Sequence, residues 1–245
     1  MKMTKLTSNG KATQAVISPD GKQVVYVIDD GGRRTLWLRQ VATATDVQLT
    51  APEDVFYLSL TISPDGNFLY YVSGSTTRGN RVLYQMPVLG GNPKKMVEDV
   101  GSPISFSPDG KQIAFVRSGR GESALMIANA DGTEERKIAV RQPPNSFGDF
   151  FQGGVAWSPD GKQIASIAHS IDSAGQFQNV IEIPFEGGTE RPLTSQKWYQ
   201  IQRLAWLADG SGLLMTAAEQ AADSRSRQIW YLSHTSGEAR KITNA

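Results

Sequence analysis

An all-β fold of the β-propeller class is predicted for this chain by three observations. The hexapeptide Ser-Pro-Asp-Gly-Lys-Gln occurs three times, and two related copies of its Asp-Gly core follow the same apolar pattern. The aspartates of the five copies are 45, 44, 51 and 49 residues apart, a spacing that suits a four-stranded propeller blade. No segment shows an apolar period long enough to compete as a helix.

Each copy of the motif is expected to form a tight turn between two strands. Proline presets φ at the first turn position, aspartate accepts bonds from nearby backbone amides, and glycine takes the positive φ that closes the turn. Short apolar runs flank every copy, as at 15–17 and 24–28. One aspartate per blade is too widely separated for a metal site or an acid/base pair, so we interpret these residues as turn formers. They are Asp20, Asp65, Asp109, Asp160 and Asp209.

A third and a fourth strand complete each repeat. The third is apolar, as at 36–38, and a two-residue turn such as Gly90-Gly91 follows it. The fourth is short and polar, which fits the outer edge of a blade, where charge discourages edge-to-edge pairing. The repeats, within one domain, cover approximately residues 8–50, 51–98, 99–140, 141–195 and 196–245.

Composition narrows the classes of ligand. Lys and Arg number 25 against 24 Asp and Glu, and a net charge of +1 argues against nucleic acid. There is no cysteine, which excludes disulfides and zinc-thiolate sites and leaves the compartment open, an extracytoplasmic one included. No apolar run is long enough to cross a bilayer, so this segment is not expected to insert in a membrane. No metal or cofactor is expected.

Catalytic machinery is not expected either. The sequence lacks the Gly-x-Ser-x-Gly elbow of serine hydrolases and holds only two histidines, His169 and His234, both expected to be exposed polar residues in or beside loops. The residues 119–124 match a loose dinucleotide-binding fingerprint, but here that segment joins two strands instead of opening a helix. The sequence therefore predicts a protein that is not an enzyme.

The repeated Ser-Pro-Asp-Gly turn with its following apolar strand resembles the WD-like repeat of TolB-type β-propellers, from about Lys5 to Ala245. Such propellers occur as periplasmic TolB, as the propeller of prolyl-oligopeptidase-type peptidases, and as sensor-like domains of bacterial serine/threonine kinases. The segments 5–10 and 87–91 are most similar to the kinase-linked group. The resemblance implies the fold and leaves the ligand open, and this chain departs from it in showing five repeats where six or more are usual.

Strand order indicates where a binding site belongs. In an up-and-down blade the first and third turns share one face, and the longer second turns and blade-to-blade connections share the other. Loops on a rigid scaffold carry function, and aromatic and arginine side chains anchor interfaces. Our candidate binding residues on this variable face are Phe56, Tyr57, Arg78, Arg81, Arg117, Arg120, Phe147, Phe150, Phe151, Trp198, Tyr199, Arg225 and Arg227.

Two functions follow from these patterns. The first is a non-catalytic scaffold that binds a protein or peptide, such as the sensor or interaction domain of a bacterial signalling protein. The second is the propeller domain of a prolyl-oligopeptidase-type peptidase, or a hydrolase or lyase with its site in a central channel. The long loop that holds Phe147, Phe150 and Phe151 has an equal alternative, in which these rings only fold the loop onto its blade.

The ends of the repeats predict that the ring is incomplete. Several fourth strands close on a pair such as Leu49-Thr50, and Leu6-Thr7 has this form although it precedes the first repeat. The segment 3–7 therefore looks like the tail of an absent repeat, and we expect the chain to be part of a longer propeller. An open ring would expose the apolar flanks of its end blades and favour self-association.

Overall fold

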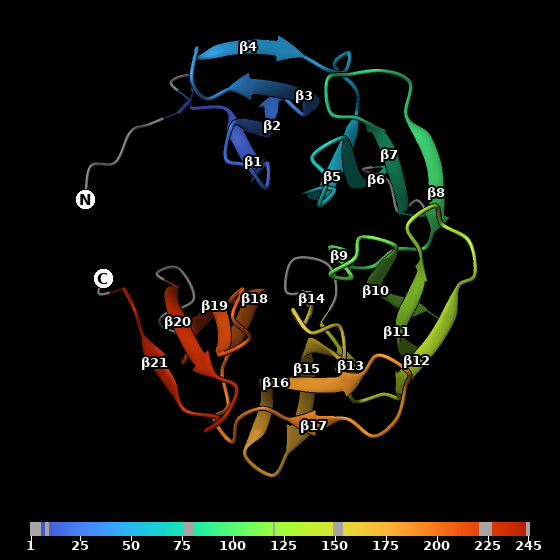
Figure 1. The fold of residues 1–245 in the computed structure, drawn as a ribbon. Coiled ribbons are helices and arrows are strands. Elements are labelled where there is room, and N and C mark those ends of the chain that lie inside the picture. The colour runs from blue at the N-terminus through green and yellow to red at the C-terminus, as the bar shows by residue number, and fades with distance from the viewer. Residues whose placement is uncertain are drawn as a thin grey trace. The chain divides into compact units, whose positions relative to one another are not determined.

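The computed structural model describes residues 6–7, 10–75, 81–119, 121–148, 154–220 and 227–243. In these residues the chain forms five antiparallel sheets and no helix, so the predicted all-β propeller fold is confirmed (Figure 1). The contacts divide the chain into two compact units, residues 1–99 and 100–245. No helix long and apolar enough to cross a membrane occurs in the described part.

The first unit holds two blades. Each is a meander in which neighbouring strands pair in chain order, and the blades meet where β1 contacts β5. Blade 1 consists of β1 (Ala12–Ile17), β2 (Gln23–Asp30), β3 (Arg33–Gln40) and β4 (Thr45–Gln48). Blade 2 consists of β5 (Val55–Ile62), β6 (Phe68–Ser75), β7 (Val82–Pro87) and β8 (Lys94–Glu98).

The second unit holds three blades, whose innermost strands β9, β14 and β18 contact one another in turn (Figure 1). Blade 3 consists of β9 (Ser105–Phe106), β10 (Gln112–Gly119), β11 (Glu122–Asn129) and β12 (Arg136–Arg141). Blade 4 consists of β13 (Ser146–Phe147), β14 (Val155–Trp157), β15 (Gln163–Asp172), β16 (Gly175–Pro184) and β17 (Arg191–Pro192). Blade 5 consists of β18 (Gln200–Trp206), β19 (Gly212–Ala218), β20 (Gln228–Ser233) and β21 (Ala239–Lys241).

The repeated motif forms the turn between the first two strands of a blade. In the first copy, the Ser18 hydroxyl donates to Asp20 Oδ1 at 2.7 Å and accepts from the Gln23 amide at 2.9 Å. Asp20 Oδ1 also accepts from the Lys22 amide at 3.1 Å, and Gly21 closes the turn at φ 71°. One serine and one aspartate thus accept hydrogen bonds from backbone amides that have no partner in the turn itself.

Blade 4 departs from the predicted repeat in two ways. Its first strand is split, because β13 and β14 both pair with β15 on either side of an insertion. Where a long second turn was expected on the variable face, β15 and β16 continue through residues 170–178 to the pair Asp172–Gly175. The cause is a two-residue turn in which Asp172 Oδ1 accepts from the Ala174 amide at 2.8 Å. Blade 4 therefore carries an extended hairpin.

Hydrophobic cores lie between neighbouring blades. One joins blades 1 and 2 around Leu36 and Leu69, a second joins blades 3 and 4 around Phe147 and Ile164, and a third joins blades 4 and 5 around Trp198. The apolar side chains on both faces of the second and third strands supply these cores, as their unbroken apolar runs predict.

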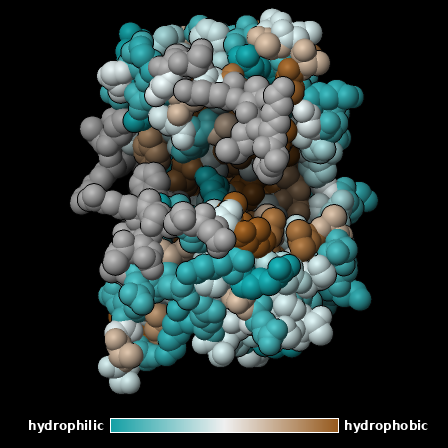
Figure 2. All heavy atoms as spheres, turned by 90° about the vertical axis from the view of Figure 1, so that its left-hand side faces the viewer, coloured by the Kyte–Doolittle hydropathy of each residue, from teal (hydrophilic) through white to brown (hydrophobic). Residues whose placement is uncertain are grey.

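The outer strands are polar. β4 is exposed at all four positions, and hydrophilic residues predominate on the outside of the blades in the view of Figure 2. The threonine that follows the fourth strand has its own structural task. The hydroxyl oxygen of Thr50 accepts from the Leu36 amide at 2.9 Å, and that of Thr243 accepts from the Ile229 amide at 3.0 Å. The repeated Leu-Thr pair thus completes the pairing of the third strand.

Candidate functional site

A polar groove lies between blades 4 and 5 on the variable face. Its volume is about 380 Å³. It is lined by His169, Gln176, Phe177, Gln178, Tyr199, Gln200 and Arg227. These residues come from the extended hairpin, from the connection into β18 and the first residue of β18, and from the position directly before β20. Two of the residues predicted from sequence, Tyr199 and Arg227, thus meet in one depression.

The extended hairpin forms a fixed wall of this groove. Gln178 and Trp198 exchange two backbone hydrogen bonds, each of 2.8 Å, which tie the hairpin to the next blade. Lys197 forms an ion pair with Asp172 and lies 4.4 Å from the centre of the Phe177 ring. Because the tip of the hairpin is held from the side, the groove is largely preformed.

His169 and Gln178 form the floor of the groove. The Gln178 side chain is buried, its Oε1 accepts from the Ile201 amide at 2.5 Å, and its Nε2 lies 3.2 Å from His169 Nε2. Arg141 donates to the carbonyl oxygen of His169 at 2.9 Å from below. The Gln178 side chain therefore contacts the His169 ring, while Arg141 of blade 3 holds its backbone, and His169 is half-buried where the sequence predicted exposure.

The rim of the groove is formed by Arg227, Gln200 and Tyr199. Gln200 Oε1 accepts from Arg227 Nε at 3.1 Å and from Nη2 at 2.8 Å, which fixes the plane of the guanidinium group. Tyr199 is 51% exposed, although a large aromatic side chain normally gains by burial. An exposed tyrosine beside an oriented arginine is the residue pattern that anchors binding interfaces.

A second depression, of about 270 Å³, lies on the other side of Tyr199 and Phe177. Its charged residues are already paired with one another or with near neighbours: Lys197 with Asp172, and Glu219 with Lys241 at 2.9 Å. The linings of the two depressions share Gln176, Phe177 and Tyr199, so the depressions adjoin each other along the hairpin, and together we call them the polar track.

The structure places the other predicted binding residues elsewhere. Tyr57, Phe147 and Trp198 are buried, with exposed fractions of 5%, 0% and 1%, because each packs into a core between blades. Their side chains are therefore not presented to a ligand, which for Phe147 agrees with the alternative of a ring that fixes its own loop. The candidates Arg78, Arg120, Phe150, Phe151 and Arg225 lie outside the described residues.

Three further candidates are half-buried and have local partners. The side chains of Phe56 and Arg81 flank Gly74, where an added Cβ would approach each of them to 3.3 Å. Arg117 forms an ion pair of 2.7 Å with Glu135 within blade 3. None of these three lines the groove.

Sequence reasoning missed most of the groove. Gln176, Gln178 and Gln200 carry no motif, and His169 was set aside as a loop residue. The available signal was the clustering of four amide or imidazole side chains near the strand ends of blades 4 and 5. These side chains can be recognised as neighbours only when the extended pairing of β15 with β16 is known.

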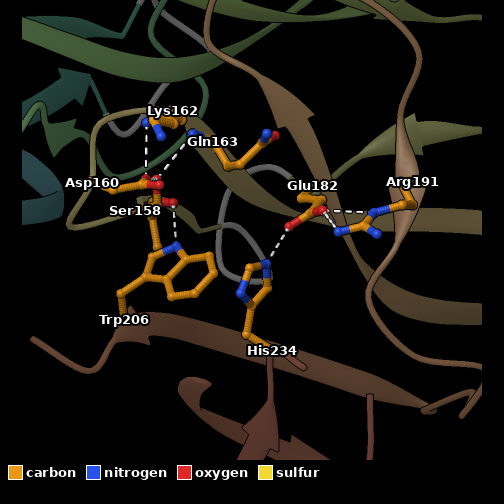
Figure 3. A network of polar contacts seen from close by, with 9 residues as sticks. Ser158, Asp160, Lys162, Gln163, Glu182, Arg191, Trp206 and His234 are labelled. Atoms are coloured by element: carbon orange, nitrogen blue, oxygen red, sulfur yellow. Dashed lines mark hydrogen bonds and ion pairs between the residues drawn. The ribbon is translucent and has the colours of Figure 1, made fainter. Parts of the chain in front are cut away.

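A second polar network lies on the opposite, tight-turn face of the same two blades (Figure 3). Glu182 on β16 has a side chain that is only 4% exposed; it forms an ion pair with Arg191 and a hydrogen-bond contact of 3.0 Å with His234 Nε2. The His234 ring meets Trp206 edge-on, with ring centres 5.0 Å apart. Trp206 Nε1 donates to the carbonyl oxygen of Ala156 at 3.0 Å. This network joins the blades and is a structural contact.

In the described ranges, no group of three or more His, Asp or Glu side chains is positioned to hold a metal ion. The chemistry that the groove offers is therefore hydrogen bonding by amides, imidazole and guanidinium, together with stacking on Tyr199.

The comparisons with known proteins support the fold. No family model matches the chain. The uncharacterized peptidase YuxL of Bacillus subtilis is 25% identical over 223 residues, which is 84% of this chain and 28% of YuxL. The Tol-Pal system protein TolB of Gluconobacter oxydans is 33% identical over 96 residues, 38% of this chain and 19% of TolB. The chain thus spans under a third of the length of these relatives.

Solved structures give the same result at lower identity. An oligogalacturonate lyase in complex with manganese superposes with a TM-score of 0.71 and 18% identity, over 98% of this chain and 67% of that one. TolB from Acinetobacter baumannii superposes with a TM-score of 0.67 and 20% identity, over 94% of this chain and 56% of that TolB chain. The TolB-like propeller fold inferred from the repeat is therefore supported, whereas the link to kinases is not shown.

The expectation that the chain is not an enzyme was wrong. Its relatives include a peptidase, and a lyase stands among the structures that share its fold. Sequence reasoning looked for a nucleophile and a base within 245 residues, whereas the match to YuxL covers only 28% of that peptidase. The absence of a nucleophile and a base in these 245 residues therefore does not separate the chain from enzymatic relatives.

Proposed function

We propose that this propeller domain binds an extended peptide segment in the groove between blades 4 and 5. The observation that carries the proposal is the preformed polar track with an exposed Tyr199 at its rim. The Gln176 side chain presents a donor and an acceptor together, as a peptide group does, and the Gln200 amide adds a further donor, so both suit the backbone of an extended chain. Tyrosine adds contact area at little cost in conformational entropy.

Binding of peptide pools tests this proposal. Fluorescently labelled pools of short random-sequence peptides are titrated with the protein, and anisotropy is measured. We expect Tyr199→Ala to weaken binding by about tenfold or more, as for an interface anchor. Leu89→Ala, at a residue that is 68% exposed in a turn of blade 2, is the matched control and is expected to change nothing. Equal binding by the wild type and Tyr199→Ala would contradict the proposal.

The match to YuxL favours a second function for the same groove. In this alternative the chain is the propeller part of a longer peptidase, and the groove receives peptide substrates before cleavage. We expect the full-length gene product to hydrolyse peptides, with KM raised and kcat little changed by Tyr199→Ala. A full-length product without any peptidase activity would exclude this alternative. In that case the resemblance to kinase-linked propellers favours a signalling protein as the full-length product.

A further inference from the structure

Arg227 is a cation without a carboxylate partner in the described part of the chain. Of the residues that line the groove, it alone carries a permanent charge, and its polar contacts are both with the neutral Gln200. Lys197 and Lys241, which flank the neighbouring depression, each have a carboxylate partner. Among the described residues, the charge of Arg227 is therefore not compensated by a carboxylate.

The guanidinium group of Arg227 is also held in a fixed orientation. Gln200 accepts from Nε and Nη2 of Arg227, which sets the plane of the guanidinium group. In the described contacts, the outer edge, formed by Nη1 and the second N–H of Nη2, remains for a ligand. A planar guanidinium recognises carboxylates in a way that lysine cannot match, because it offers two parallel N–H groups. Gln176 is exposed on the opposite wall and supplies a further amide donor.

We infer that the groove recognises a carboxylate of the bound peptide through Arg227, with Gln200 as the residue that positions the guanidinium group. This inference rests on the proposed peptide-binding function and names the ligand group that the groove selects. A peptide supplies a carboxylate from its C-terminus or from an Asp or Glu side chain. Both sources share the same chemistry, so the experiment has to separate them.

Four labelled peptide pools make this separation. They combine a free or an amidated C-terminus with the presence or absence of Asp and Glu, and binding is measured by fluorescence anisotropy. We expect the pool with neither carboxylate to bind about tenfold or more weakly than the best pool, since a charge-assisted pair is lost. Whichever single carboxylate restores binding identifies the source.

Substitutions at the arginine complete the test. Arg227→Gln should remove the difference between the pools, Arg227→Lys should restore only part of it, and Gln200→Ala should reduce it. Arg33→Gln, on an exposed arginine of blade 1, is the matched control and should leave the difference intact. Thermal unfolding of each variant, monitored by circular dichroism, shows whether the fold is kept.

The outcomes separate the inference from the proposed function. If all four pools bind equally and Tyr199→Ala still weakens binding, peptide binding stands and carboxylate recognition is overturned. If no pool binds, the proposed peptide function fails. A galacturonate oligomer in the same assay supplies carboxylates without peptide groups. Arg227-dependent binding of that oligomer alone would overturn the peptide function, and with it the inference that the carboxylate belongs to a peptide.

Discussion

At the scale of single residues, the repeated aspartates link the turns to pH. The Ser18 hydroxyl and the Lys22 amide stabilise the ionised form of Asp20, which lowers the pKa of its carboxyl from 3.8 to about 2. Serine hydroxyls lower the pKa of Asp65, Asp109 and Asp160 in the same way. In the degenerate fifth copy the Ser211 amide is the main cause of the lowered pKa of Asp209.

These depressed pKa values predict loss of stability in acid. The stabilisation by the Asp20 carboxylate is fully present above its unfolded pKa of 3.8 and is lost as the pH falls through about 2. We expect Asp20→Asn to flatten the fall of the urea midpoint between pH 4 and pH 2, with Glu186→Gln as the control carboxylate in another turn. If Asp20→Asn had the same pH profile as the wild type, the turn would not stabilise the ionised form of the Asp20 carboxyl over the protonated form.

The buried carboxylate of Glu182 gives a second prediction at this scale. His234→Ala removes one of its two side-chain partners, and a buried acceptor left without a hydrogen-bond partner costs about 1–3 kcal/mol. Urea unfolding should therefore show His234→Ala less stable than the wild type. Thr235→Ala, at the next and exposed position, is the control. Equal midpoints for both variants would mean that Arg191 alone satisfies Glu182.

At the scale of strands and turns, close packing limits which glycines can change. A Cβ on Gly212, at the start of β19, would overlap the carbonyl oxygen of Leu232 and lie 2.7 Å from the Tyr231 ring. Gly119, at the end of β10, has open space at the same position. We expect Gly212→Ala to cost about 1–3 kcal/mol in urea unfolding, and Gly119→Ala to be nearly neutral. Similar costs for both would show that the overlap at Gly212 does not determine the cost of the substitution.

The strands also show how far sequence reasoning reaches. The turn at Ser18–Gln23 could be predicted, because proline, aspartate and glycine specify a local conformation without help from distant residues. The split of β13 from β14 and the extension of β15 could not, since both depend on pairing partners that lie far along the chain. The same limit applies to the groove. Tyr199 and Arg227 were placed on one face, but an aromatic residue such as Trp198 gives no local sign of whether it is buried or exposed.

At the scale of the whole molecule, stability is distributed among separate cores between blades. Stacked repeats contact mainly their neighbours, so a lesion in one core should be felt most in the blades that share it. Leu36 is fully buried in the core of blades 1 and 2, and Leu125 is fully buried in that of blades 3 and 4. Each Leu→Ala change should cost about 2–5 kcal/mol.

Native-state hydrogen exchange with peptide resolution measures where that cost falls. Leu36→Ala should accelerate exchange in residues 12–98 more than in residues 105–241, and Leu125→Ala should give the reverse pattern. The comparison is internal, because the two variants delete the same side-chain atoms from equally buried sites. If each variant accelerated exchange by the same factor in all five blades, the chain would open only as a whole, and the division into two units would have no energetic meaning.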